Sequence, residues 1–153
     1  MRSTMGVVMA VKSTVDIDIH APQTAVAELF ADPRNNPKWM DDLERVELVS
    51  GEVGAAGSQY RMVSPDARMN FVATVRDRDL PNEVRLRLDG SNVVVDITDR
   101  FTTPSQGVTR LVSEEIFTFK GPIARIFGIL AQNRIRDAHR RHMMSFKRFA
   151  ESR

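Results

Sequence analysis

The chain opens with a strict alternation of apolar and polar residues over positions 12–19. One face would carry Val11, Ser13, Val15, Ile17 and Ile19, and the other Lys12, Thr14, Asp16 and Asp18. A period of two residues is typical of a strand with one buried face. We therefore expect a half-buried strand at this end of the chain.

The period then changes to that of a helix. Pro22 is suited to a first helical position, and Val26, Leu29 and Phe30 recur at helical spacing. Residues 32–40 contain two prolines and two asparagines, which favours a turn with at most one helical turn near Pro37. Two short helices are predicted here.

Residues 43–118 lose the helical period, and apolar alternation returns in short stretches. These stretches cover residues 46–49, 59–63, 68–78, 84–88, 93–101 and 109–119. Short connections rich in Gly, Pro, Asn and Asp separate them, and such connections join antiparallel strands. A long antiparallel meander is expected.

A helical period follows Pro122 and continues to Glu151 without another proline. It predicts one helix of up to about 30 residues, or roughly 45 Å at the α-helical rise, so it must lie across the sheet. Its apolar stripe comprises Phe127, Ala131, Ile135, Ala138, His142 or Met143, Phe146 and Phe149. The predicted fold is α+β: a curved antiparallel sheet of about seven strands around one long C-terminal helix.

Composition narrows the possible chemistry. A chain of 153 residues suits one domain, with residues 1–10 as a flexible or additional segment and Met1, Met5 or Met9 as the start. The absence of cysteine excludes disulfides, zinc–thiolate and iron–sulfur sites and a cysteine nucleophile. The apolar run before Lys12 is too short for a signal peptide. A cytoplasmic location is expected.

The net charge of +2 is unevenly distributed. Residues 123–153 carry eight basic and two acidic side chains, so the rest of the chain is acidic. Arg136, Arg140 and Arg148 would lie on an outward helix face, either as solvated charge or as a weak contact with an anionic membrane. Nucleic acid is not an expected partner, because no aromatic residues are interleaved with the basic ones.

Several separated motifs resemble one protein family. They are STVDIDIHAP (13–22), APQTAVAELFADPRNNPKW (21–39), VELVSGEVGAAGSQY (46–60), GVTRL (107–111), FKGPI (119–123) and MMSFKRFAE (143–151). In this order they resemble the polyketide cyclase/dehydrase and lipid-transport family of the SRPBCC, START-like helix-grip superfamily. The resemblance implies a helix-grip fold with a cavity between sheet and helix.

Three functions are compatible with this resemblance. The first is the binding or transport of a small hydrophobic or amphipathic molecule, such as a lipid, a sterol-like compound or a polyketide. The second is a cyclase or dehydratase that uses pocket carboxylates, and the third is a regulatory or toxin-like module that acts through the basic helix. We favour the binding function, by a monomer or homodimer without a cofactor.

The candidate catalytic residues are Glu115 and Asp99. If the last hairpin turns near Ser105, Glu115 lies opposite Val95 and Asp99 opposite Leu111, and both carboxyls face the interior. A bulge would instead leave both in solvent. The candidate ligand-binding residues are Trp39, Tyr60, Met62, Met69, Phe71, Leu86, Val95, Ile97, Leu111, Ser113, Phe127, Leu130 and Arg134, the last as a counter-ion.

The remaining candidates have structural interpretations. His139 and His142 are spaced to share a metal ion, but the sequence offers no third ligand, so no metal site is expected. Gly51, Gly54 and Gly57 are predicted to be turn residues. The eight methionines are unusual, and Met62, Met69 and Met143 would give the sheet–helix interface an adaptable lining.

Overall fold

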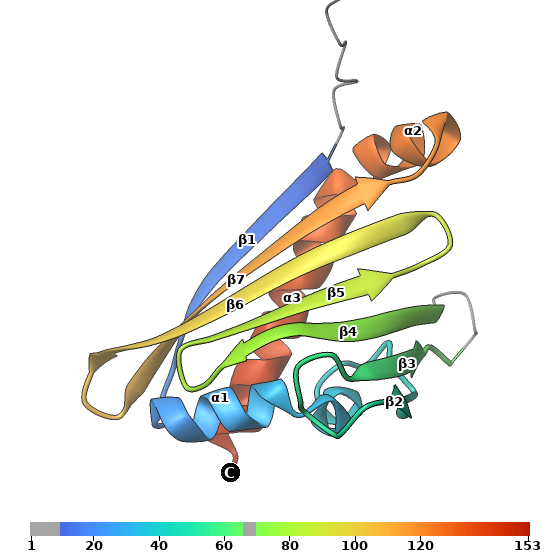
Figure 1. The fold of residues 1–153 in the computed structure, drawn as a ribbon. Helices are drawn as coiled ribbons and strands as arrows, with labels where there is room; N and C mark the ends of the chain where they lie inside the picture. The colour runs from blue at the N-terminus through green and yellow to red at the C-terminus, as the bar shows by residue number, and fades with distance from the viewer. Residues whose placement is uncertain (1–9, 66–69) are drawn as a thin grey trace, which may run out of the picture.

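The computed structural model describes residues 10–65 and 70–153 and contains one antiparallel sheet with a long helix across one face (Figure 1). Strand order across the sheet is β1-β7-β6-β5-β4-β3-β2. The strands are β1 (Ala10–Ile19), β2 (Arg45–Ser50), β3 (Gln59–Val63), β4 (Asn70–Asp79), β5 (Glu83–Asp89), β6 (Val93–Ser105) and β7 (Val108–Phe119). The predicted α+β class and meander are confirmed.

The two short helices follow β1. They are α1 (Gln23–Ala31) and the 3-10 helix η1 (Pro33–Lys38). Asp32 separates them, and its side chain accepts a hydrogen bond from the backbone N–H of Arg34. Proline then fits the first position of η1, where no backbone donor is needed. This stretch delivers the only tryptophan, Trp39, to the interior with 9% exposure.

The C-terminal helix is not continuous, which corrects the prediction of one uninterrupted helix. It consists of α2 (Pro122–Leu130) and α3 (Gln132–Glu151), with Ala131 between them at φ −91° and ψ 1°. Gly128 explains the break, because a Cβ there would lie 2.4 Å from the ring of Phe119 on β7. This close approach holds α2 at the end of β7, while α3 packs along β1. One straight helix would not make both contacts.

Among the described residues, no helix is long and apolar enough to cross a membrane.

An aromatic cluster forms the main core at the end of the sheet that carries α1. Phe146 of α3 packs edge-on against Phe30 at 4.9 Å and against Trp39 at 5.3 Å between ring centroids. Phe101 of β6 completes the cluster against Phe30. These contacts hold the C-terminal half of α3 firmly on the sheet.

A second, smaller apolar group lies on β3 and β4. It comprises Tyr60, Met62, Ala73 and Val75, with Met40 and Leu86 shared with the aromatic core. The two groups are separate clusters linked by these partly buried residues. Space therefore remains between the middle of the sheet and α3.

We predict that Phe146→Ala lowers the free energy of unfolding by about 3–5 kcal/mol, because it removes a fully buried ring from the contact between α1, η1 and α3. Denaturant unfolding followed by circular dichroism measures this change. Val49→Ala is the control, since Val49 is 48% exposed and its truncation should alter stability by no more than about 0.5 kcal/mol. Equal losses in the two variants would contradict the core described above.

Candidate functional site

Two adjoining cavities lie between the sheet and α3. Their volumes are about 80 and 220 Å³, and Met40, Met62, Leu88, Glu115 and His142 border both. The smaller cavity is also lined by Phe30, Pro33, Asn36, Trp39, Tyr60, Ala73, Leu86, Ile97, Asp99, Ser113 and Met143. The larger is also lined by Asp42, Leu43, Ser64, Phe71, Val95, Phe117, Ile135, Ala138 and His139. Flexible methionine side chains thus separate two compartments of one mainly apolar space.

Most of the predicted binding residues lie at these cavities. Those that line them are Trp39, Tyr60, Met62, Phe71, Leu86, Val95, Ile97 and Ser113, together with Asp99 and Glu115. Met69 lies outside the described residues. Strand alternation identified all of these positions except Trp39, because each faces the concave side of the sheet, whereas Trp39 was proposed from the proline-rich turn that contains it.

Four predicted residues lie elsewhere. Phe127 and Leu130 are 67% and 77% exposed, because the break at Ala131 turns the apolar face of α2 away from the sheet. Arg134 is exposed on the first turn of α3 and lines neither cavity. Leu111 is fully buried, but it packs in the aromatic core rather than at a cavity wall.

The register of the last hairpin differs from the prediction by two residues. Glu115 pairs with Ile97 rather than Val95, and Asp99 pairs with Ser113 rather than Leu111. The hairpin turns at Gln106 and Gly107, where Gly107 has a φ of +74°. A shift of two leaves every side chain on its predicted face. Both acids therefore face the interior, and the alternative that placed them in solvent is wrong.

A buried histidine joins β1, β7 and α3. Hydrogen bonds link the Ser13 hydroxyl to Nδ1 of His139 (2.7 Å) and the Ser113 hydroxyl to Nε2 (2.9 Å). Desolvation, with a smaller contribution from the charge of His142, lowers the pKa of His139 to about 4. A neutral imidazole has one donor and one acceptor nitrogen, so one serine donates to the ring and the other accepts from it. The ring is satisfied structurally and carries no charge near neutral pH.

The two carboxyls beside this histidine lack a cationic partner among the described residues. Burial raises the pKa of Asp99 to about 7, and Ser113 lies close enough to offset part of that rise. Burial and the charge of Asp99 raise the pKa of Glu115 to about 8. Oε1 of Glu115 lies 3.7 Å from Nδ1 of His139, which is too long for a hydrogen bond and, with a neutral ring, no ion pair.

Three buried polar atoms at the smaller cavity have no hydrogen-bond partner within the described residues. They are Nε1 of Trp39 and both carboxylate oxygens of Asp99. Unpaired buried polar groups cost on the order of 1–3 kcal/mol each, so native proteins rarely retain them without a use. Their position at a cavity wall makes this the best candidate binding site in the described chain.

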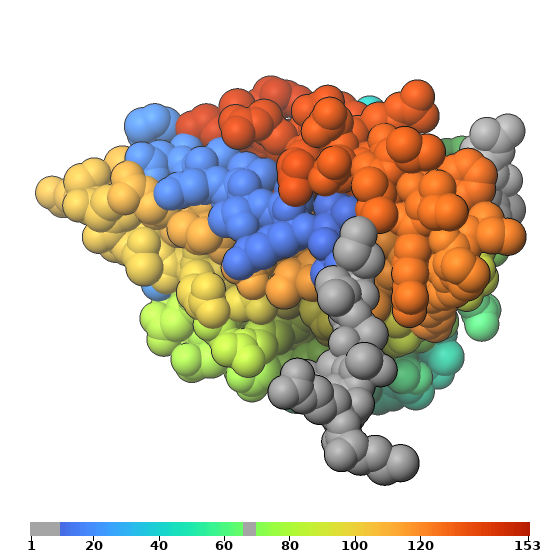
Figure 2. Space-filling view, turned by 90° about the horizontal axis from the view of Figure 1, so that it is seen from above, coloured from blue at the N-terminus to red at the C-terminus, as the bar shows by residue number. Residues whose placement is uncertain are grey.

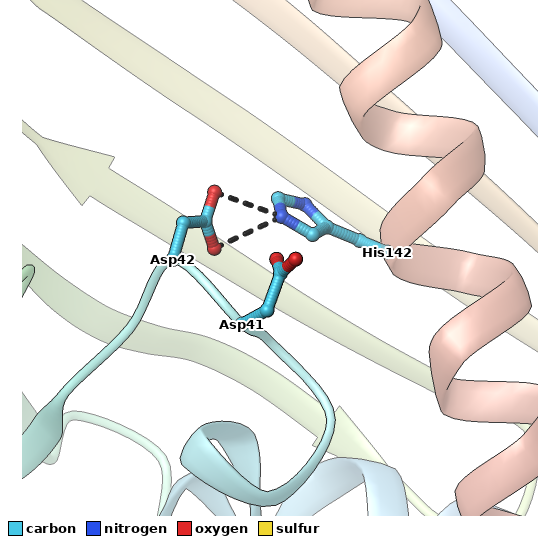
Figure 3. A group of neighbouring side chains, drawn as sticks. All are labelled: Asp41, Asp42 and His142. Atoms are coloured by element: carbon cyan, nitrogen blue, oxygen red, sulfur yellow. Dashed lines mark hydrogen bonds and ion pairs between the residues drawn. The ribbon is translucent and has the colours of Figure 1, made fainter.

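A polar cluster that borders the cavities through Asp42 and His142 also contains the exposed Asp41 (Figure 3). Their nearest ligand atoms lie within 4.8 Å of one another, and carboxylate and imidazole groups are ligands for a divalent cation. The protein's own groups already pair here. Nε2–H of His142 donates to both Asp42 oxygens at 3.0 Å, and the Arg141 guanidinium lies 4.0 Å from Asp41. We interpret the cluster as a link that holds the loop after η1 to α3.

Several cavity residues were missed by the sequence patterns. Asp42 and Met40 lie in an irregular turn, where no period shows which side chains point inward. His142 was a candidate for the apolar stripe of the helix, but its partner Asp42 is distant in sequence. Pairings of this kind depend on tertiary structure and leave no local signal.

We predict that stability falls as pH rises from about 6.5 to 9. Asp99 and Glu115 have native pKa values of about 7 and about 8. The native state therefore keeps protons that the unfolded state loses near pH 4. The stability that these protons contribute is lost as pH rises through the two native pKa values. His139 opposes the trend only between about pH 4 and 6.5, because its native pKa is lowered.

Thermal unfolding over this pH range tests the prediction. The expected loss is about 2 kcal/mol for the wild type, and Glu115→Gln and Asp99→Asn should each reduce the slope. Glu114→Gln is the matched control, because Glu114 is the neighbour on the outer face and pairs with Lys12. A slope that survives in both inner variants would mean that other groups cause it.

Comparisons with known proteins agree with this architecture. The family model described as polyketide cyclase/dehydrase and lipid transport matches residues 10–151. No curated protein sequence matches the chain.

Three solved structures illustrate the similarity in fold. A START superfamily protein from Mycobacterium smegmatis has a TM-score of 0.76 at 12% identity, with 92% of this chain and 97% of that chain covered. A Thermus thermophilus protein has a TM-score of 0.66 at 20% identity, with 92% of this chain and 94% of that chain covered. A Rhizobium leguminosarum protein has a TM-score of 0.69 at 16% identity, with 94% of this chain and 97% of that chain covered. At these identities the structures show the shared fold alone, whereas the family model covers nearly the whole sequence. The chain belongs to the polyketide cyclase/dehydrase and lipid-transport family.

Proposed function

We propose that the protein binds a small hydrophobic or amphipathic molecule in the joined cavities between the sheet and α3. The observation that carries this proposal is an apolar space with unpaired polar atoms at its wall. Such a combination suits a ligand that buries carbon surface and places a few polar groups at defined positions.

The lining supports binding more than simple imperfect packing. The larger cavity has a volume of about 220 Å³, far more than the ~10–15 Å³ that one water molecule needs. Met40 and Met62 border both cavities and Met143 borders the smaller one, and these side chains can change rotamer to fit different shapes. The family description, with its lipid transport and polyketides, agrees with a ligand of this kind.

An enzymatic role as a cyclase or dehydratase rests on the same two carboxyls. A pKa of about 8 would let Glu115 move a proton near neutral pH. Binding requires only the cavity and its polar wall, whereas catalysis also requires a reacting atom held against Glu115. We therefore propose binding as the function that the geometry supports best.

We predict that an uncharged apolar fluorescent probe such as N-phenyl-1-naphthylamine enters the cavities and changes the emission of Trp39, the only tryptophan. Ala73→Leu should fill the smaller cavity and Ala138→Leu should narrow the larger one, and each should weaken uptake about tenfold.

The control for the filling variants is Ala56→Leu, which adds the same volume at an exposed loop position. Fluorescence titration with a panel of lipid-like and aromatic probes gives the affinities. Unchanged Trp39 emission across the whole panel, or equal binding by the filled variants, would contradict the proposal.

We propose in addition that α2 contacts an anionic lipid surface. Five of its large apolar side chains are exposed: Ile123, Ile126, Phe127, Ile129 and Leu130. Figure 2 looks onto the end of the molecule where α2 (orange) forms part of the surface. Exposed Arg125 and Arg134 flank this face, and apolar side chains beside basic ones are typical of helices that lie in a membrane interface.

Co-sedimentation with phosphatidylcholine vesicles, with and without phosphatidylserine, tests this contact. Binding should require the anionic lipid, weaken with salt, and decrease severalfold in Phe127→Ser and Leu130→Ser. Val49→Ser removes an exposed apolar side chain from β2 and should bind normally. If the wild type is instead a dimer that Phe127→Ser dissociates, and no vesicle binding occurs, the face is an interface between two copies.

A further inference from the structure

The titratable groups that the described residues give the cavity wall include acids but no lysine or arginine. The titratable residues that line the two cavities are Asp42, Tyr60, Asp99, Glu115, His139 and His142. Within the described residues, neither wall includes a lysine or an arginine. Asp42 already accepts from His142, and Tyr60 accepts from the backbone N–H of Gly54. Asp99 and Glu115 are therefore the acids left to meet a ligand.

The sheet register places these two acids beside each other. Asp99 lies opposite Ser113 on β7, and Glu115 is two residues further along that strand on the same face. Such diagonal neighbours have backbones about 7–8 Å apart, so both carboxyls can approach one small group between them. Asp99 is fully buried and the Glu115 side chain is only 17% exposed, so water screens this pair weakly.

This arrangement disfavours an anionic ligand. At pH 8, where Asp99 is charged, a fatty-acid carboxylate would lie against another negative charge with no cation to compensate it, and desolvation would add to the cost. Arg134, the counter-ion expected from the sequence, is on the outer surface instead. A protonated amine, in contrast, supplies donors to both carboxyls and the positive charge that the wall lacks.

We propose that the ligand is an amphipathic amine, with its ammonium group between Asp99 and Glu115 and its apolar part in the space bordered by the methionines. This inference rests on the proposed binding function and specifies the ligand class. It explains why Asp99 has no cationic partner within the described part of the protein, since the positive charge is supplied by the ligand.

Proton release accompanies binding of such a ligand. In the free protein the carboxyls of Asp99 and Glu115 hold protons near neutral pH, because their pKa values are raised. An ammonium group favours their charged forms, so they lose protons when the amine binds and amine affinity rises with pH up to about 8. The other groups that face them are His139, which is neutral in this range, and His142, which is paired with Asp42.

Three probes with the same chain separate the possibilities: decylamine, decanol and decanoate. Isothermal titration calorimetry at pH 8 should give an affinity for decylamine at least about tenfold above decanol, with decanoate the weakest. Near pH 7, decylamine binding in buffers of different ionisation enthalpy should show proton release, and decanol binding should show none.

The variants Glu115→Gln and Asp99→Asn should each remove most of the preference for decylamine over decanol while decanol still binds. Their controls are Glu114→Gln and Asp96→Asn, outer-face neighbours that pair with Lys12 and Arg87. The two inner variants are independent, so a folding defect in one leaves the other as the test.

The outcomes distinguish the ligand class from the binding function. If decanol or decanoate binds as tightly as decylamine, or if the preference persists in both inner variants, the amine proposal is wrong while binding in the cavity stands. If none of the three probes binds and the apolar probe panel also fails, the binding function itself is wrong.

Discussion

The central constraint in this molecule is a pair of carboxyl groups held beneath a helix with no positive charge beside them in the described chain. Asp99 and Glu115 lie on adjacent central strands and face α3, in a space lined mainly by carbon. Burial raises their pKa values into the neutral range. Their burial therefore lowers the free energy of unfolding near neutral pH. Replacing either acid by an apolar residue of similar size would avoid that cost, and this is why we assign the pair a role in binding.

The packing on either side makes this space possible. At one end of the sheet, Phe30, Trp39, Phe101 and Phe146 interlock and fix the C-terminal half of α3. At the other end, Gly128 brings α2 against Phe119 and ends the helix at Ala131. Between these anchors α3 spans the sheet (Figure 1). Methionines and small side chains lie beneath it and fill the gap only in part. Contacts at both ends with an adaptable lining in the middle suit a binding cavity.

Much of the fold was predictable because its signals are local. Strand alternation predicted the inward faces of β1, β6 and β7. The register error of two residues left these faces correct, because a shift of two keeps each side chain on the same side of the sheet. The break at Ala131 was not predictable, because it arises from the contact between Gly128 and Phe119, which no periodicity records. For the same reason Phe127 and Leu130 were assigned to the cavity, although they lie on the surface. The link between Asp42 and His142 joins residues a hundred positions apart and is visible only in three dimensions.

A crystal structure of the protein soaked with decylamine tests the amine site most directly. We expect the ligand nitrogen within hydrogen-bond distance of the carboxyls of Asp99 and Glu115, with the chain passing between Met40 and Met62. A ligand in the opposite orientation, with its nitrogen in solvent and its chain end at Asp99, would contradict it. So would a structure in which the cavities stay closed and decylamine lies only on the apolar face of α2.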